Sequence, residues 1–178
     1  MKLDAEGWLS GVRRYFSPNC DARPHATRIN LLVVHNISLP PGEFGGDAVI
    51  QLFTNLLDVK AHPYYAQLEG LKVSAHFFIR RSGEIIQFVP CSRRAWHAGV
   101  SRWRGRERCN DFSIGIELEG TDAEAFTSMQ YASLAKLTRR LQRAYPICEI
   151  VGHSDIAPER KTDPGPNFDW SRYFAMLK

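Results

Sequence analysis

The run INLLVVH at 29–35 constrains the fold more than any other segment, because it is apolar, rich in leucine and β-branched residues, and ends in a histidine. Such a run favours a strand buried within a sheet. The turn-rich NISLPPGEFGG at 36–46 follows and is predicted to end that strand. The sequence therefore predicts a buried strand that delivers the imidazole of His35 to the edge of a sheet.

The segment DFSIGIELEG at 111–120 alternates between apolar and other residues, the pattern of a second strand. Its apolar side chains are Ile114, Ile116 and Leu118. Successive side chains of a strand point to opposite faces. Glu117 is therefore predicted to project away from the apolar face, beside Gly115, which has no side chain.

Helical and hairpin patterns alternate with these strands. A helix is predicted at 47–58, with Asp47 as N-cap and with apolar residues Val49, Ile50, Phe53, Leu56 and Leu57. A β-hairpin at 73–90 around Arg81-Ser82-Gly83 follows, and then a helix from the capping box of Thr127 and Gln130 to Pro146. The last two elements are a short strand at 147–153 that ends in His153 and a helix at about 169–177 that buries Trp170, Tyr173, Phe174 and Leu177. This order predicts an α/β fold of mixed α+β type, with a central mixed β-sheet flanked by helices. Ligand sites form at strand ends in such folds.

A chain of 178 residues with 44% hydrophobic content can bury one sizeable core, so a single domain is predicted over 1–178, with its core at about 28–170. No apolar run approaches the length of a membrane span. The N-terminal MKLDAEGWLSGVRRYF has acidic residues where an export signal is basic, which favours the cytoplasm. The four cysteines form no C-x-x-C pair, as expected for reduced thiols. A monomer is the default expectation.

The net charge of +4 favours anionic partners, and nucleic acid has to be considered. The basic residues come in short groups with no continuous tract and no nucleic-acid-binding motif. A solvated surface with one anion-recognising patch is the favoured interpretation, with neither nucleic acid nor a membrane as partner.

Of the six histidines, only His35 and His153 close apolar runs at predicted strand ends. A lone histidine there is structural more often than not, so spacing alone leaves a metal site the minority interpretation. The other four are His25 and His62, expected on the surface, His76, expected in the core or supporting a ligand, and His97, which could line a pocket.

The segment HSDIAPERKTDPG at 153–165 makes a metal site more favourable. Lys161 and Asp163 are two residues apart, and a residue before proline is biased to extended backbone, so the two side chains are predicted to point the same way. The carboxylate would then ligate a metal, with the ammonium beside it. From spacing alone, a local ion pair on a solvated loop is equally favoured. A catalytic zinc site needs three ligands from histidine and carboxylate, with one position open to water.

Five segments together carry a resemblance to a known family: LLVVHNISLPPGEFGG, VSAHFFI, AWHAGVS, GRERCNDFSIGIELEG and VGHSDIAPERKTDPGPNFDW. They are similar to the zinc-dependent N-acetylmuramoyl-L-alanine amidases of bacterial cell-wall recycling, within a wider family that includes phage amidases and peptidoglycan recognition proteins. The similarity runs from about 7 to 170, nearly the whole chain. It implies the zinc amidase, or peptidoglycan-recognition-like, fold and one zinc ion per chain.

The resemblance also implies a role for each matched residue. Zinc would be held by His35, His153 and Asp163, with Glu117 as proton acceptor and Lys161 stabilising the transition state. The implied substrate is an anhydromuropeptide, cleaved at the amide between the lactyl group of 1,6-anhydro-N-acetylmuramic acid and L-alanine of the stem peptide. Loss of this activity would let anhydromuropeptides accumulate, and in bacteria with an inducible β-lactamase that pool signals its expression.

Further residues are implied to bind substrate: Asn36, Lys72, Trp96, His97 and Arg108. Arg108 would bind an anionic group of the stem peptide. Lys72 stands where relatives have arginine, and lysine lacks the guanidinium fork that binds a carboxylate through two hydrogen bonds. This difference affects the expected affinity rather than the class of reaction. The Gly- and Pro-rich loop at 38–46 is predicted to act as a mobile gate.

Three other functions remain open. A non-catalytic muropeptide sensor on the same scaffold is disfavoured, because such binders commonly lack a zinc ligand that this chain retains. A phage-type lytic amidase acting on intact peptidoglycan shares the chemistry, and the absence of a recognisable export signal or wall-binding module disfavours it. A basic nucleic-acid-binding domain is the third.

Overall fold

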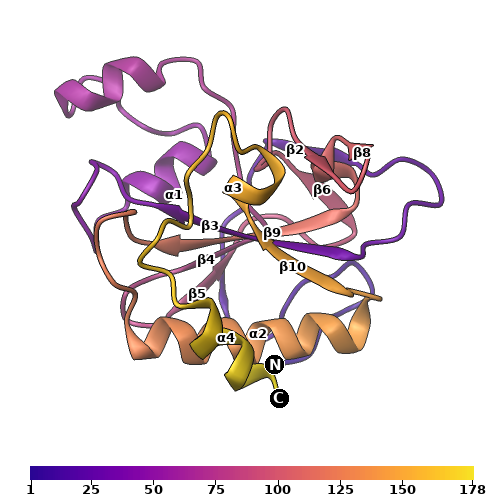
Figure 1. The fold of residues 1–178 in the computed structure, drawn as a ribbon. Coiled ribbons are helices and arrows are strands. Elements are labelled where there is room, and N and C mark those ends of the chain that lie inside the picture. Colours follow the sequence, from indigo (N-terminus) through magenta and orange to yellow (C-terminus); the bar gives the residue numbers. More distant parts are fainter.

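A six-stranded mixed sheet lies at the centre of the computed structural model, which describes residues 1–178 (Figure 1). Its strands, in spatial order, are β1 (Arg13–Arg14), β5 (Ile85–Gln87), β4 (Phe77–Ile79), β9 (Ser113–Glu119), β3 (Leu31–Ile37) and β10 (Glu149–Gly152). β4 and β5 form the predicted antiparallel hairpin, and the other neighbouring strands run parallel. The mixed sheet expected from the sequence is confirmed.

Smaller elements surround this sheet. Two further sheets pair β2 (Cys20–Ala22) with β6 (Arg93–Ala95) and β7 (Arg102–Trp103) with β8 (Arg106–Glu107). The helices are α1 (Ala48–Phe53), the 3-10 helices η1 (Pro63–Leu68) and η2 (Cys109–Asp111), α2 (Ser128–Ala144), α3 (His153–Ile156) and α4 (Trp170–Leu177).

The central strands β3 and β9 pair in parallel along their full length, and every residue of β9 is buried. Within the predicted run 29–35, the buried strand begins at Leu31. The strand nevertheless continues to Ile37, because Asn36 and Ile37 still pair with β9. His35 therefore lies inside the strand rather than at its end.

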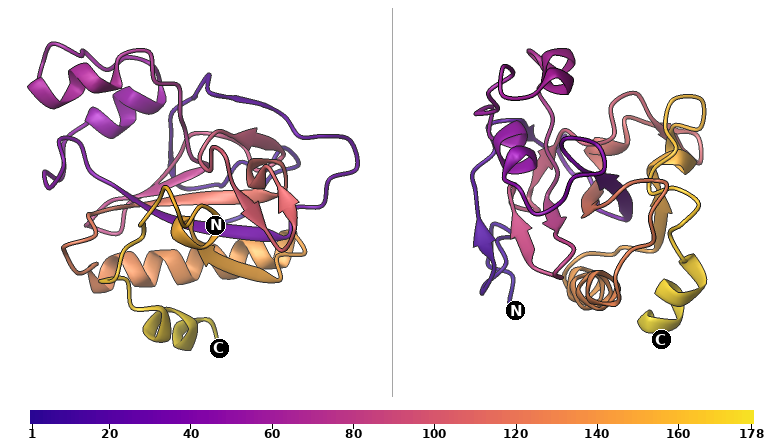
Figure 2. Two further views of the ribbon diagram at one scale, coloured as in Figure 1. Left: turned by 45° about the horizontal axis from the view of Figure 1, so that its top comes forward. Right: turned by 90° about the vertical axis from the view of Figure 1, so that its left-hand side faces the viewer.

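Helices α2 and α4 cover one face of the sheet (Figures 1 and 2). The core on this face includes Leu32 and Val34 of β3, Ile114, Ile116 and Leu118 of β9, Leu134, Leu137 and Leu141 of α2, and Tyr173 of α4. The capping box of Thr127 and Gln130 is present at the start of α2. The expected burial of Phe174 is wrong, since its exposed fraction is 42%, while Tyr173 takes the fully buried position. In a helix of eight residues only a narrow stripe can face the sheet.

The opposite face carries α1, α3 and the β2–β6 sheet (Figure 1). The helix expected at 47–58 ends at Phe53, because Asn55 adopts a left-handed backbone conformation with φ of 60°. Leu56 consequently lies outside the helix and its exposed fraction is 74%. The carboxylate of Asp47 makes no cap and instead accepts a hydrogen bond of 2.8 Å from Arg80.

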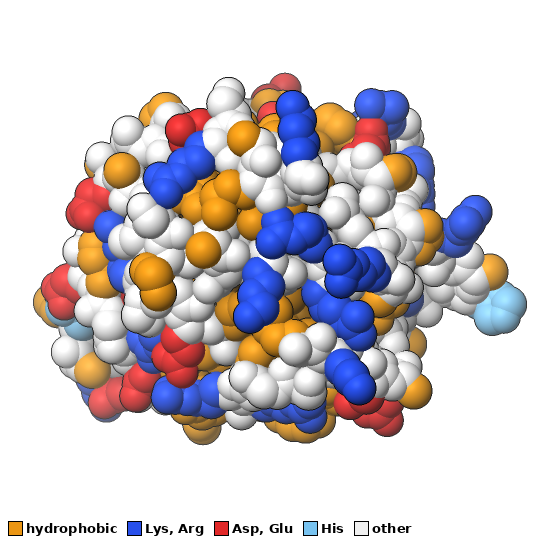
Figure 3. All heavy atoms as spheres, turned by 90° about the horizontal axis from the view of Figure 1, so that it is seen from below, with side chains coloured by type: hydrophobic (Ala, Val, Ile, Leu, Met, Phe, Trp, Pro, Cys, Tyr) orange, Lys and Arg blue, Asp and Glu red, His pale blue; other side chains and the backbone are white.

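Lysine and arginine side chains gather on the face formed by α2 and α4 (Figure 3). Exposed cations of these helices include Lys136, Arg139, Arg143 and Arg172. Much of the excess positive charge therefore lies on the side of the sheet away from α1 and α3. No helix has both the length and the apolar content required to cross a bilayer.

Candidate metal centre and active site

His35, His153 and Asp163 meet on the face of the sheet opposite α2. The Nδ1 atoms of His35 and His153 are 3.0 Å apart, and Asp163 Oδ2 is 3.1 Å from each of them. Both histidines are buried, with exposed residue fractions of 1% and 3%. The sequence identified these three residues, and the fold joins them in one cluster.

The pairing of the strands accounts for this convergence. β10 runs parallel to β3 with Gly152 opposite Val34, so His153 at the start of α3 follows next to His35. The backbone N–H of Ser154 donates to the Asp163 carbonyl at 2.9 Å and anchors the returning loop. Gly152 allows a close approach of that loop, since a Cβ there would lie 2.7 Å from Pro164 Cδ.

The outward nitrogens of both histidines have hydrogen-bond partners. His153 Nε2 lies 3.1 Å from the Ala98 carbonyl, which can only accept. His35 Nε2 lies 2.9 Å from His97 Nδ1, and His97 Nε2 lies 3.1 Å from Ser113 Oγ. With the Nε2–H groups of His35 and His153 donating outward, both Nδ1 atoms present lone pairs to the cluster. Outward partners of this kind set the tautomer of histidine metal ligands.

The surroundings of His35 and Asp163 keep both groups in the protonation states that a metal requires. Desolvation lowers the pKa of His35 to about 4, although Asp163 opposes the shift. Burial by itself raises the pKa of Asp163, but the contacts with His153 and His35 outweigh it and leave the pKa below its usual range. At neutral pH His35 is therefore a neutral imidazole and Asp163 an ionised carboxylate, the forms that bind a metal.

The donor set fits a catalytic zinc ion. Two Nδ1 lone pairs and a carboxylate oxygen at 3.0–3.1 Å repel one another unless a cation lies among them. Tetrahedral zinc ligands at about 2.0–2.1 Å from the metal lie roughly 3.3 Å from each other, close to the separations here. Two histidines and one carboxylate leave a fourth position for water, which is the arrangement of a catalytic rather than a structural site.

Glu117 lies beside the cluster. It pairs with His35 across β9 and β3, and its Oε1 is 4.0 Å from His35 Nδ1. Its Oε2 is buried without a hydrogen-bond partner. Burial first, and then the charge of Asp163, raise the pKa of Glu117 well above its usual range, although Lys161 opposes this. A buried carboxylate of this kind is suited to take up and release a proton.

A cavity of about 510 Å³ opens onto these groups. Of the residues implied to act on substrate, Asn36, His97, Glu117 and Lys161 line it, together with Asp163 of the metal cluster. The side chain of Asn36 donates to Asp122 at 2.7 Å and to the Pro164 carbonyl at 3.0 Å, so it also supports the loop that carries Asp163. His97 both lines the cavity and contacts His35.

The remaining three implied residues do not line this cavity. Lys72 is exposed and borders a separate hollow of about 190 Å³. Trp96 is half-buried, and its backbone bonds with Ser74. Arg108 borders a cavity of about 990 Å³ beside β7 and β8, and 70% of its side chain is exposed. Their role in binding stays a prediction.

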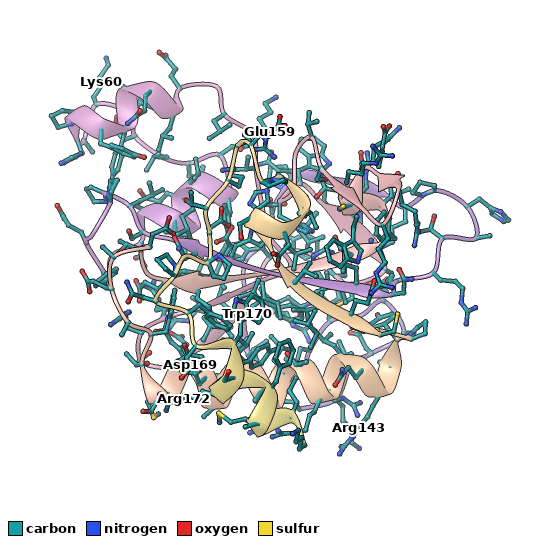
Figure 4. The ribbon with its side chains drawn as sticks, in the orientation of Figure 1. Lys60, Arg143, Glu159, Asp169, Trp170 and Arg172 are labelled. Carbon is teal, nitrogen blue, oxygen red and sulfur yellow. The ribbon has the colours of Figure 1, made fainter.

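The loop at 38–46 contributes Ser38, Leu39 and Pro41 to the cavity wall. Its end is anchored, because Glu119 accepts 2.7 Å and 2.8 Å hydrogen bonds from the backbones of Gly45 and Arg81. Figure 4 shows the two sides of the sheet. Lys60, between α1 and η1, and Glu159, after α3, lie on one side, and Arg143 of α2 lies on the other. Whether the 38–46 loop moves as a gate stays a prediction.

Sequence reasoning missed most of the supporting groups. A Cβ on Gly115 would lie 2.4 Å from His97 Cγ, so the ring of His97 packs directly on bare backbone. The available sequence signal for this contact was Gly115, a residue without a side chain on the same strand face as Glu117. The roles of Ala98 and Ser113 had no signal, because a carbonyl and a serine hydroxyl occur throughout any chain. His76 is buried as expected, with its Nδ1 accepting from Gly115 N at 3.1 Å.

Comparison with known proteins agrees with this geometry. The family model described as N-acetylmuramoyl-L-alanine amidase matches residues 25–166. The 1,6-anhydro-N-acetylmuramyl-L-alanine amidase AmpD of Citrobacter freundii is 60% identical over 99% of this chain and 95% of its own. The AmpD of Escherichia coli K12 is 61% identical over 97% of this chain and 95% of its own.

Solved structures give the same relationship. A crystal structure of a selenomethionine derivative of AmpD has a TM-score of 0.97 at 60% identity and covers 100% of both chains. The E. coli amidase AmiD, in complex with the substrate anhydro-N-acetylmuramic acid-L-Ala-D-γ-Glu-L-Lys, has a TM-score of 0.63 at 31% identity, covering 86% of this chain and 60% of that one. On the extent of these matches, the chain belongs to the N-acetylmuramoyl-L-alanine amidase family.

Proposed function

We propose that this chain hydrolyses the amide between the lactyl group of 1,6-anhydro-N-acetylmuramic acid and L-alanine of the stem peptide, with one zinc ion held by His35, His153 and Asp163. The observation that carries the proposal is the cluster of three donor atoms 3.0–3.1 Å apart beside Glu117, whose Oε2 is buried without a hydrogen-bond partner. The relatives named for this anhydromuramyl substrate, at 60–61% identity, support the choice of amide.

Zinc, when bound, would lower the pKa of a water molecule and polarise the substrate carbonyl. The chain contributes the proton transfers. Glu117 accepts a proton as the water oxygen bonds to the lactyl carbonyl carbon. It then gives that proton to the alanine nitrogen as the carbon–nitrogen bond breaks, so the carboxylate is regenerated and no other acid is consumed.

Lys161 is the second residue with a direct role in this scheme. It lines the same cavity as Glu117 and Asp163. An ammonium group here would stabilise the negative charge that develops on the carbonyl oxygen. Its positive charge also acts on Glu117, whose pKa it lowers against the effect of burial.

The products would be the anhydromuramyl sugar and a free peptide. This cleavage would be a step in peptidoglycan recycling. We extend the proposal to the whole of 1–178 as one amidase domain acting as a monomer on a small-molecule substrate. A consequence is that loss of activity raises the anhydromuropeptide pool, which signals β-lactamase expression in bacteria that carry an inducible β-lactamase. The cytoplasmic location expected from the sequence stays a prediction.

Mass spectrometry of the zinc-loaded protein incubated with anhydromuramyl peptide tests the proposal. We expect release of an L-alanyl peptide, and loss of release after treatment with a chelator. Intact peptidoglycan serves as the competing substrate. Preferential cleavage of that polymer would favour the phage-type alternative. Binding of anhydromuramyl peptide without cleavage would favour the sensor.

A further inference from the structure

Asn110, which belongs to η2 immediately before β9, makes an unusual pair of contacts with the segment beside the metal cluster. Its side-chain Oδ1 accepts hydrogen bonds from two consecutive backbone N–H groups, of His97 at 3.2 Å and of Ala98 at 2.8 Å. One amide oxygen therefore fixes the position and orientation of this dipeptide.

The same two residues contact the two histidines of the cluster. The imidazole of His97 accepts the outward N–H of His35 at 2.9 Å. The carbonyl of Ala98 accepts the outward N–H of His153 at 3.1 Å. The two acceptors that hold the protons on the outward nitrogens, and so leave the Nδ1 lone pairs facing the cluster, thus both belong to the dipeptide that Asn110 holds.

Asn110 is itself firmly held. Its backbone carbonyl accepts a hydrogen bond of 3.1 Å from the guanidinium of Arg23, which also binds the carbonyls of Asp111 and Ser113 at 2.8 Å. The His97 ring has little freedom to compensate for a shift, since it packs against the backbone of Gly115. A displacement of the dipeptide would therefore pass directly to His35 and His153.

We propose that Asn110 is a positioning residue for the metal site, because its side-chain oxygen orients the outward partners of both histidine ligands at once. It lies outside both the three-residue cluster and the lining of the 510 Å³ cavity. The inference rests on the proposed zinc ligands. Partners behind metal ligands typically contribute about 10- to 100-fold in metal affinity.

The test measures zinc dissociation constants by chelator competition, together with the visible spectrum of the cobalt-substituted protein. Asn110→Leu removes the acceptor, Asn110→Asp retains it, and Asn110→Ser is a milder change for the case in which Asn110→Leu does not fold. Gln87→Leu is the matched control. Gln87 is a buried amide whose oxygen likewise accepts a backbone N–H, from Leu9 at 2.7 Å, but it contacts no residue of the cluster.

We expect Asn110→Leu or Asn110→Ser to weaken zinc binding by about 10- to 100-fold and to change the cobalt spectrum. Asn110→Asp should restore affinity and spectrum, and Gln87→Leu should lower the melting temperature with both unchanged. Wild-type zinc affinity in Asn110→Leu or Asn110→Ser, or equal loss in Asn110→Asp or Gln87→Leu, would overturn the inference. Failure of the wild-type chain to bind one zinc would instead overturn the proposed ligands.

Discussion

Glu117 and His35 occupy directly opposed positions on the paired strands β9 and β3, with Glu117 Oε1 4.0 Å from His35 Nδ1. The parallel register thus places the proposed proton acceptor beside a proposed metal ligand without any loop between them. Sites on strands are held more rigidly than sites on loops. The proposed proton transfer depends on that register, because a shift of one residue would turn Glu117 to the other face of the sheet.

Replacing Glu117 by glutamine tests the proton acceptor. The amide preserves the shape of the side chain but cannot accept the proton of the attacking water. Turnover should fall by about 100- to 10,000-fold, while the protein keeps one zinc per chain. Steady-state assays with elemental analysis measure both quantities. Turnover close to wild type would remove Glu117 from the reaction.

The contribution of Lys161 is separable from metal binding. Lys161→Ala should lower turnover by about 100- to 1,000-fold with zinc retained, because one preorganised group that stabilises the oxyanion is lost. The control is Lys136→Ala, which removes an exposed lysine of α2 on the opposite side of the sheet and should leave turnover unchanged. Equal activities in the two variants would contradict the assignment.

Asp163→Ala should abolish zinc binding and activity together. Without the carboxylate, the two imidazoles provide too few donor atoms for a stable zinc site. The affinity for zinc should fall by more than about 100-fold, which exceeds the effect expected from changing a residue that only supports a ligand. Metal content after gel filtration is the measurement, with the exposed Asp58→Ala as control. Full zinc occupancy in Asp163→Ala would mean that another ligand replaces Asp163 or that the ligand set is different.

Gly115→Ala should damage the site through His97. The added methyl group would lie 2.4 Å from His97 Cγ and must displace the ring from His35. We expect a loss of about 1–3 kcal/mol in the free energy of unfolding and weaker zinc binding. Gly46→Ala is the matched control, since a Cβ there has no atom within 4 Å. Urea denaturation and chelator competition report the two effects. Unchanged zinc affinity would show that the His97 contact is dispensable.

His76 should make the fold sensitive to acid. Burial, and then the charge of Arg23, lower its pKa from 6.5 to about 3 in the folded protein. Between these two values the unfolded chain binds a proton that the folded chain does not. This contribution to stability is therefore complete above pH 6.5 and is lost as the pH falls towards 3, by up to about 1.4 kcal/mol per pH unit.

Urea denaturation of metal-free protein at pH 7 and pH 5 measures this effect. The drop in unfolding free energy should be smaller in His76→Gln than in wild type. The other buried histidines are present in both proteins, so the difference between the two drops reports on His76 together with its effect on the neighbouring His97. An identical drop in the two proteins would show that His76 is accessible to protons in the native state.

The sequence alone determined the local features of this protein. Alternation at 111–120 set Glu117 and Gly115 on one strand face, and the capping box of Thr127 and Gln130 fixed the start of α2. These features depend on residues close in the chain, where periodicity and hydrogen bonds to neighbouring backbone are decisive. The short-range pattern was misleading at the end of α1. The helical spacing of apolar residues continues beyond the helix, but Asn55 adopts a left-handed backbone conformation that ends it.

Only the tertiary structure decided which residues meet. His35 and His153 are 118 positions apart in the chain and come within 3.0 Å because β10 pairs with β3 in one register. A shift of one residue would turn every side chain of the strand to the other face, and no local pattern encodes the pairing itself. The support of both histidines by one dipeptide, held by Asn110, arises from the same long-range packing and leaves no trace in residue type or spacing.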